Sequence, residues 1–264
     1  MARTTAAALH RSSPKKLPVR EAPTLSPGLQ LFLQHARIRS VPSKTVLISA
    51  GETAEHLFYV LTGSVEVLIE DDSGNEIVLA YLSKGQFFGE MGLFGIDKRT
   101  AFVRARGRAE IAEIPYSRFR QLANETPSLT FEIATQLAVR LERTNRKLSD
   151  LAFVDVSGRI AHALLDLCDE PEAMTHPEGT QIRVSRQELS RLVGCSREMA
   201  GRVLKALEAQ GLLQARGKTV VLFDVRPASR GLVAARTLKT LPGKAGRAQP
   251  AAAIAACMAR TVAA

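Results

Sequence analysis

The chain has 264 residues, 45% of them hydrophobic, and a formal net charge of +10, a length that accommodates two ordinary domains with flanking tails. No apolar run reaches the roughly 18 residues of a membrane span, so we expect a soluble protein without a membrane partner. Three widely spaced cysteines exclude a disulfide framework and favour the reducing cytoplasm. No metal-binding histidine spacing, nucleophile elbow, phosphate loop or catalytic triad occurs, so we expect neither a metal site nor an enzyme.

The positive charge is concentrated in the two ends of the chain. Residues 1–26 and 227–264 together hold 11 Lys or Arg and one acid, whereas residues 27–226 hold 25 of each. The overall charge is therefore no evidence for a nucleic-acid-binding core. A local excess does occur in residues 183–218, which hold eight basic residues and three acidic ones, and this is the asymmetry that requires an explanation.

Residues 44–115 read as short strands separated by turn signals. In the segment SVEVLIE, Val65, Val67 and Ile69 share one face. Glu66 lies on the other face, which is the alternation of a half-buried strand. The link DDSGNE, whose glycine is free to take a positive φ, predicts a hairpin to the next strand. Many short strands with glycines at their corners favour a sandwich or jelly roll.

A helical period begins near residue 126. The residues that recur at steps of three and four are Ala134, Leu137, Leu141, Thr144, Leu148 and Leu151. This spacing is typical of a two-stranded coiled-coil seam, although a helix packed on its own barrel is the alternative. Thr144 favours the seam, because a polar residue inside a seam usually sets the register or contacts a buried ligand.

Two short helices joined by a glycine turn follow. Ser185 and Glu188 form a capping box at the first helix, which ends at Gly194, and Ser196 caps the second. The residues expected to face inward are Leu189, Leu192, Ala200, Val203, Leu204 and Leu207. This is the helix-turn-helix pattern, and two short strands, GLLQAR and TVVLF, complete a winged version.

The outward face of the second helix carries Arg197, Glu198, Gly201, Arg202 and Lys205. Arginine can donate two hydrogen bonds to the O6 and N7 of guanine, and glutamate can accept one from the N4 of cytosine. Gly201 keeps this face low, so that the helix can approach a groove. A solvated face with pairs such as Glu198 and Arg202 is the alternative, but the helix-turn-helix context favours DNA.

Residues 34–226 resemble the bacterial cyclic AMP receptor protein (catabolite activator protein) family, on the motifs LAFVDVSGRIAHALLDL, EPEAMTHPEGTQIRVSRQEL, VGCSRE and GKTVV. The resemblance implies an α+β cytoplasmic homodimer that binds TGTGA-like palindromes in double-stranded DNA and contacts RNA polymerase. The expected parts are a basic disordered tail at 1–26, a cyclic-nucleotide-binding jelly roll at 27–126, a dimerisation helix at 127–154, a winged helix-turn-helix at 155–226, and a disordered tail at 227–264.

The resemblance also implies two kinds of contact surface. Arg197, Glu198 and Arg202, with Lys205 on the same face, match the base-reading residues. The residues that match positions near the DNA backbone are Ser185, Arg186, Gln187 and Ser196. The residues that match polymerase contacts are Thr175, His176, Pro177 and Gly179 in an exposed Pro-rich loop, and Arg37, Arg39 and Arg118 in a basic patch. Asp71, Asp72 and Glu76 match a third, acidic contact, with solvated turn acids as an equal alternative.

The stretch GEMGLFGIDKRTA, residues 89–101, matches the phosphate-binding cassette of the family. By this resemblance, the backbone from Gly89 to Met91 approaches the ligand and Glu90 accepts from the ribose 2′-hydroxyl. Arg99 pairs with the cyclic phosphate and Thr100 binds a phosphate oxygen. The residues that close over the nucleotide from the dimer helix are Arg140, Thr144 and Asn145, the last in place of the usual serine. An exposed Glu90–Arg99 ion pair is the alternative.

We therefore expect cyclic AMP as the effector, which would favour a longer coiled coil and set the recognition helices about 34 Å apart. The first alternative is a cyclic di-GMP-responsive branch of the same family, although Arg99 and Thr100 are intact here. The second is a cyclic-nucleotide-binding module without a regulatory role on DNA.

Overall fold

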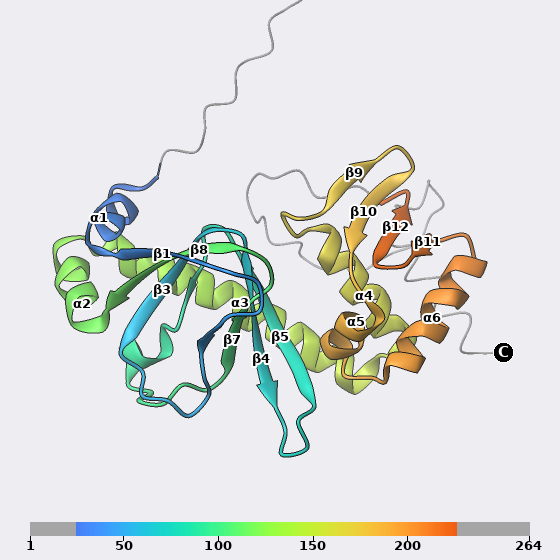
Figure 1. Cartoon of the computed structure of the whole chain (residues 1–264), viewed down its shortest axis with the longest axis horizontal. Coiled ribbons are helices and arrows are strands. Elements are labelled where there is room, and N and C mark those ends of the chain that lie inside the picture. The colour runs from blue at the N-terminus through green and yellow to red at the C-terminus, as the bar shows by residue number, and fades with distance from the viewer. Residues whose placement is uncertain (1–24, 226–264) are drawn as a thin grey trace, which may run out of the picture.

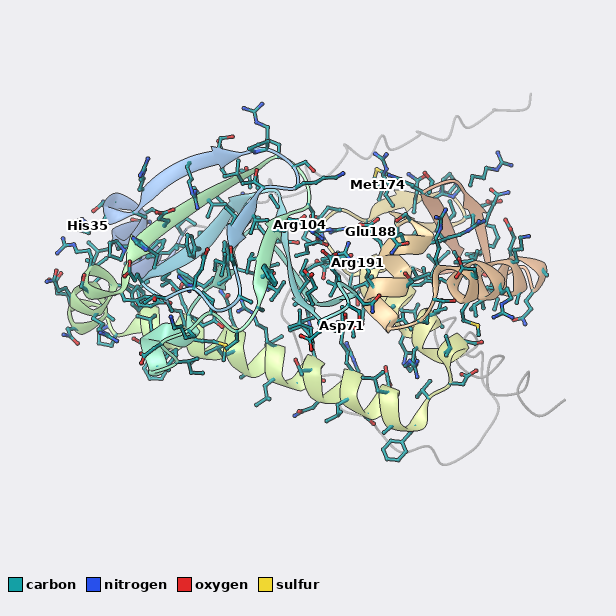
Figure 2. All side chains as sticks on the ribbon, turned by 60° about the horizontal axis from the view of Figure 1, so that its bottom comes forward. His35, Asp71, Arg104, Met174, Glu188 and Arg191 are labelled. Carbon is teal, nitrogen blue, oxygen red and sulfur yellow. The ribbon has the colours of Figure 1, made fainter. Side chains whose placement is uncertain are left out.

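The computed structural model describes residues 25–225, so the expectations for the tails at 1–24 and 226–264 lie outside the described residues. The chain folds into a β-rich part and a smaller helical part, and one long helix runs along both (Figures 1 and 2). Within residues 25–225, no helix is both long and apolar enough to cross a membrane.

The β-rich part consists of two antiparallel four-stranded sheets, ordered β1-β8-β3-β6 and β2-β7-β4-β5. Its strands are β1 Arg37–Val41, β2 Val46–Ile48, β3 His56–Thr62, β4 Ser64–Glu70, β5 Glu76–Ser83, β6 Phe87–Phe88, β7 Phe102–Ala105 and β8 Ala109–Pro115. The hairpin between β4 and β5 is present, with Gly74 at φ +80°. These strands form the expected jelly roll, since their inner faces hold a core of fully buried aliphatic and aromatic residues.

Strand β4 is not half-buried. Val65 faces the sandwich interior, as its place in the alternation predicts. The opposite face is covered by the helical part, so that Leu68 is only 2% exposed and even Glu66 is only 6% exposed. An extra residue in β5 at Leu79 shifts the register beside Leu68. The prediction of a solvated outer face was therefore wrong, because alternation alone gives no sign of a second domain packed on it.

Three helices accompany the jelly roll: α1 Pro27–His35, α2 Tyr116–Glu125 and α3 Ser128–Phe153. In α3 only Leu129 and Ile133 are buried, and both pack into the jelly-roll core. Further along α3 the exposed fractions are 62% for Leu141, 66% for Leu148 and 57% for Leu151. The first turns of α3 thus pack on their own barrel, whereas the seam leucines beyond them lie open to solvent.

The helical part begins at α4 Val156–Cys168, capped by Asp155, and continues with α5 Arg186–Val193 and α6 Arg197–Ala209. The capping box of Ser185 and Glu188, the left-handed Gly194 at φ +70° and the Ser196 cap are all present. The sheet of this part has the order β11-β12-β10-β9, with β11 Leu213–Arg216 and β12 Thr219–Phe223 as the expected wing strands.

The segment of residues 173–181 is a hairpin rather than a loop. It forms β9 Met174–His176 and β10 Gly179–Arg183, which pair with each other and, through β10, with β12. The proline and glycines that indicated a loop mark only its turn and strand ends. The expected loop is therefore a hairpin that extends the wing sheet to four strands.

Candidate functional site

The cassette of residues 89–101 surrounds the guanidinium of Arg99. Its Nη1 donates to the carbonyl oxygen of Gly89 at 3.0 Å and to the hydroxyl of Tyr116 at 2.9 Å, and its Nη2 donates to the carbonyl oxygen of His56 at 2.8 Å. Gly89 has φ +72°, and a Cβ there would lie 2.8 Å from Arg99 Nη1, so only glycine fits this approach. Donors of Arg99 that are not used by these oxygens are available to an anion.

Glu90 does not pair with Arg99. Its carboxylate, in a residue only 7% exposed, lies 3.4 Å from Nη1 of Arg140 on α3. Arg140 also donates to the carbonyl oxygen of Phe87 at the start of β6. Burial lowers the pKa of the Arg140 guanidinium, and the charge of Glu90 opposes that effect. The alternative of an exposed Glu90–Arg99 pair is therefore wrong, and the long helix is tied directly to the cassette.

The other residues expected to bind the ligand differ in whether their side chains contact the cassette. Met91 begins the 3₁₀ turn η1 Met91–Phe94, and the exposed Thr100 donates to its sulfur at 3.3 Å. Thr144 and Asn145 are exposed on α3, and the Thr144 hydroxyl donates to the carbonyl oxygen of Arg140 at 2.9 Å. Of the three helix residues, Arg140 is the one whose side chain contacts the cassette within residues 25–225.

Two residues at this site were not identified from the sequence. Tyr116 hydrogen-bonds both Arg99 and the carbonyl oxygen of Gly89, and burial raises the pKa of its phenol. Gln136 of α3 accepts from the backbone N–H of Phe87 at 2.9 Å and donates to the carbonyl oxygen of Gly85 at 3.0 Å. Neither residue lies in a recognisable motif. The packing of α2 and α3 on the sheet brings Tyr116 to the cassette and Gln136 to the strand that precedes it.

The recognition face of α6 is open. Arg197, Glu198, Arg202 and Lys205 are exposed, as are Arg186, Gln187 and Ser196, while Ser185 is half-buried. The stem of Arg186 lies 3.4 Å from the position of a Cβ on Gly201, which is an ordinary van der Waals distance, so the packing of α5 against α6 does not itself require glycine here. Of the six residues expected to face inward, Leu192 is half-buried and the other five are buried.

The residues matched to polymerase contacts fall on two separate surfaces. Thr175, His176, Pro177 and Gly179 lie on the β9–β10 hairpin, where the backbone N–H of Glu178 donates to Nδ1 of His176 at 3.3 Å. Arg37, Arg39 and Arg118 lie at the far end of the jelly roll, where Arg118 contacts His35 and Arg39 pairs with Glu113 at 3.0 Å. Figure 2, which labels His35 and Met174, shows this separation.

The third expected surface is largely engaged within the chain. Asp71 accepts from the backbone of Ser73 and Asn75 and so closes the hairpin turn. Glu76 binds Arg104 through both carboxylate oxygens. Of the three acids, Asp72 is the one with an exposed side chain for which the described residues show no such bond. Within the same residues, His, Cys, Asp and Glu form no group of three that could hold a metal.

Two family models match the chain, one for each part of the fold. The cyclic nucleotide-binding domain matches residues 38–126, and the Crp-like helix-turn-helix domain matches residues 158–226. A solved structure of the c-di-GMP responsive global regulator CLP of Xanthomonas campestris is similar with a TM-score of 0.70 and 52% identity, covering 74% of this chain and 98% of that one.

Curated relatives show the same similarity along the sequence. The chain is 52% identical over 205 residues to the cAMP-activated global transcriptional regulator CRP of Pasteurella multocida, covering 77% of this chain and 98% of the relative. It is 50% identical over 202 residues to the cAMP-activated global transcriptional regulator Vfr of Pseudomonas aeruginosa, covering 75% and 94%. The chain therefore belongs to the CRP family of transcription regulators, in which a cyclic nucleotide-binding domain precedes a Crp-like helix-turn-helix domain.

Proposed function

We propose that the chain is a homodimeric, cyclic AMP-responsive transcription regulator of the cytoplasm that binds TGTGA-like palindromes and contacts RNA polymerase. It is a regulator rather than an enzyme, as its relatives are. The helix-turn-helix match removes the alternative of a nucleotide-binding module without a role on DNA. We place the domain boundaries at 27–126, 127–154 and 155–226.

The observation that carries the proposal is the contrast within the cassette between Arg99 and Glu90. Arg99 supplies one positive charge beside the Gly89 backbone, which matches the single charge of a cyclic phosphate. Glu90, only 7% exposed, supplies an acceptor suited to a ribose hydroxyl. Arg140 of α3 lies with its Nη1 3.4 Å from the Glu90 carboxylate. A nucleotide that displaced Arg140 from Glu90 would therefore change a contact of the long helix.

Calorimetric titration of the purified chain with cyclic AMP, cyclic GMP and cyclic di-GMP tests this proposal. We expect cyclic AMP to bind most tightly and to strengthen binding of a TGTGA palindrome. Tighter binding of cyclic di-GMP, with weaker binding to DNA, would instead favour the alternative represented by the Xanthomonas campestris regulator, which is 52% identical. No heat with any of the three nucleotides would remove the assignment of the cassette.

The DNA contacts are tested by comparing two arginines of the helix-turn-helix. We expect Arg197→Ala to weaken binding to the TGTGA palindrome by about 10- to 100-fold and to leave binding to a scrambled duplex nearly unchanged, because a bidentate base contact contributes about 1–3 kcal/mol. Arg186→Ala should weaken binding to both duplexes alike and reduce the salt dependence, as loss of a phosphate contact does. Fluorescence anisotropy across a salt series measures both, and equal effects of Arg197→Ala on the two duplexes would contradict its base-reading role.

A further inference from the structure

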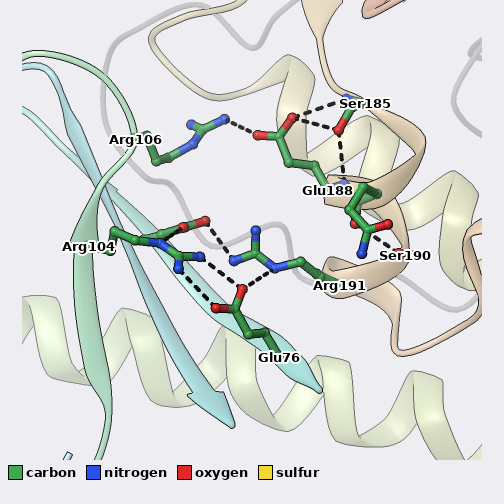
Figure 3. A network of polar contacts seen from close by, with 9 residues as sticks. Glu76, Arg104, Arg106, Ser185, Glu188, Ser190 and Arg191 are labelled. Atoms are coloured by element: carbon green, nitrogen blue, oxygen red, sulfur yellow. Dashed lines mark hydrogen bonds and ion pairs between the residues drawn. The ribbon is translucent and has the colours of Figure 1, made fainter. Parts of the chain in front are cut away.

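The two domains are joined by a closed ring of charged side chains in which carboxylates and guanidiniums alternate (Figure 3). Nε of Arg104 on β7 lies 2.7 Å from Glu66, and its two terminal nitrogens lie 2.9 Å from the two oxygens of Glu76. Arg191 on α5 closes the ring, with Nη2 at 3.1 Å from Glu66 and Nε at 2.9 Å from Glu76. We call these four residues the interdomain ring.

The interdomain ring is neutral only when the helix-turn-helix lies against the jelly roll. The jelly roll alone supplies two carboxylates and one guanidinium, and Arg191 brings the missing positive charge from the other domain. The side-chain exposures are 8% for Glu66, 15% for Arg191, 23% for Glu76 and 24% for Arg104. Loss of Arg191 would leave a carboxylate at this depth without its partner, which is costly, so the docked arrangement depends on Arg191.

Two further contacts hold the start of α5 in the same orientation. Arg106 lies over the ring of Tyr81 at 3.7 Å and reaches to within 3.6 Å of Glu188. Glu188 is the capping-box residue of α5, so this contact acts next to Ser185 at the helix start. Leu68, Val78 and Tyr81 of the jelly roll also join the apolar core of the helix-turn-helix. The hydrogen bonds from Arg104, and secondarily the charge of Arg191, hold the pKa of the Glu76 carboxyl below its usual range against the effect of burial, so Glu76 carries its charge at neutral pH.

This docked arrangement leaves the expected base-reading residues accessible. Arg197, Glu198 and Arg202 are exposed on α6, and α3 is one continuous helix to Phe153, with its seam leucines open to a partner. Nothing in residues 25–225 has to move to uncover the recognition face. The interdomain ring therefore stabilises an arrangement in which the recognition face is uncovered.

We propose that Arg191 is a positioning residue that, through Glu66 and Glu76, holds the helix-turn-helix in its DNA-binding orientation when no nucleotide is bound. The ion pairs of Arg191 within residues 25–225 are with Glu66 and Glu76. Its proposed role is to set how strongly the affinity for DNA depends on the nucleotide. With the ring intact, the free chain retains part of its DNA affinity. Without it, DNA binding becomes more strictly dependent on cyclic AMP.

The experiment uses two full-length variants whose net charges change in opposite directions, Arg191→Met and Glu76→Gln. Binding to a TGTGA palindrome is measured with and without saturating cyclic AMP. We expect each variant to bind DNA about fivefold more weakly than the unmodified chain without nucleotide, and within about twofold of it with nucleotide, as for a modest coupling between domains. The double variant should lose no more than either single variant, and Arg191→Lys should recover part of the loss.

Charge alone predicts a different result, because Glu76→Gln removes a negative charge and would then tighten binding to DNA. Tighter or unchanged binding by Glu76→Gln would overturn the proposal. Equal losses with and without cyclic AMP would also overturn it, and thermal unfolding shows whether such a loss comes from a destabilised fold.

Arg108→Met is the matched control, since Arg108 is exposed on the jelly roll outside the ring. Its effect on DNA affinity should be the same with and without cyclic AMP. The proposal rests on the proposed function, but if cyclic AMP leaves the unmodified chain unaffected, that function fails while the nucleotide-free comparison still tests Arg191.

Discussion

An Arg99→Leu variant is expected to bind cyclic AMP at least about a hundredfold more weakly than the unmodified chain. Charge-assisted hydrogen bonds contribute about 1.5–3 kcal/mol each, and a guanidinium offers a phosphate two parallel ones. Calorimetry measures the affinity for cyclic AMP directly. In the same variant, cyclic AMP should no longer strengthen binding to palindromic DNA. Unchanged cyclic AMP affinity in a folded Arg99→Leu protein would remove Arg99 from the site.

Two further variants separate the binding role of Arg99 from its role in the fold. Arg99 also satisfies oxygens of Gly89, His56 and Tyr116, so leucine leaves these groups without their donor and destabilises the jelly roll. Arg99→Lys keeps the charge but loses the planar pair of donors, and we expect an intermediate loss of about tenfold. Tyr116→Phe removes one partner of Arg99 without changing the charge, so the cyclic AMP affinity should change little.

Features set by neighbouring residues could be predicted from the sequence. The capping box at Ser185, the left-handed Gly194 and the hairpin at Gly74 each depend on a few consecutive residues, and each occurs as expected. The hairpin at residues 173–181 was missed although it is local, because its proline and glycines are equally common in loops. Local patterns therefore predicted the order of most elements but not every strand.

Contacts across long stretches of the chain could not be predicted in the same way. Glu66 and Arg191 are 125 residues apart, and nothing in the alternation of β4 indicates that its outer face is covered. Arg140 pairs with Glu90 because α3 is fixed to β6 through Gln136, a contact that depends on the angle between helix and sheet. The family resemblance named Arg140 and Glu90 separately, but only the packed structure shows that they bind each other.

A second large effect is expected from the seam of α3. Leu141 and Leu148 are 62% and 66% exposed, and an exposed row of large apolar side chains marks an interaction surface. We expect a double variant, Leu141→Glu with Leu148→Glu, to be monomeric at micromolar concentration where the unmodified chain is a homodimer. Sedimentation equilibrium measures this difference. Affinity for the palindrome should fall at least about a hundredfold, because burial of each leucine contributes about 1.5–3 kcal/mol and the partner helix loses the same contacts.

The control for this variant adds one carboxylate, of the two that the double leucine variant adds, to α3 away from the seam. Ser149→Glu lies one residue beyond Leu148 on the exposed face of the helix and should leave the dimer and the DNA affinity nearly unchanged. A double leucine variant that stayed dimeric would place the dimer interface elsewhere and would separate Thr144 from it. The leucine variant could instead lose both the dimer and the affinity for cyclic AMP while Ser149→Glu keeps them. The nucleotide site would then include the seam, because Thr144 lies in the seam and donates to Arg140, which pairs with Glu90.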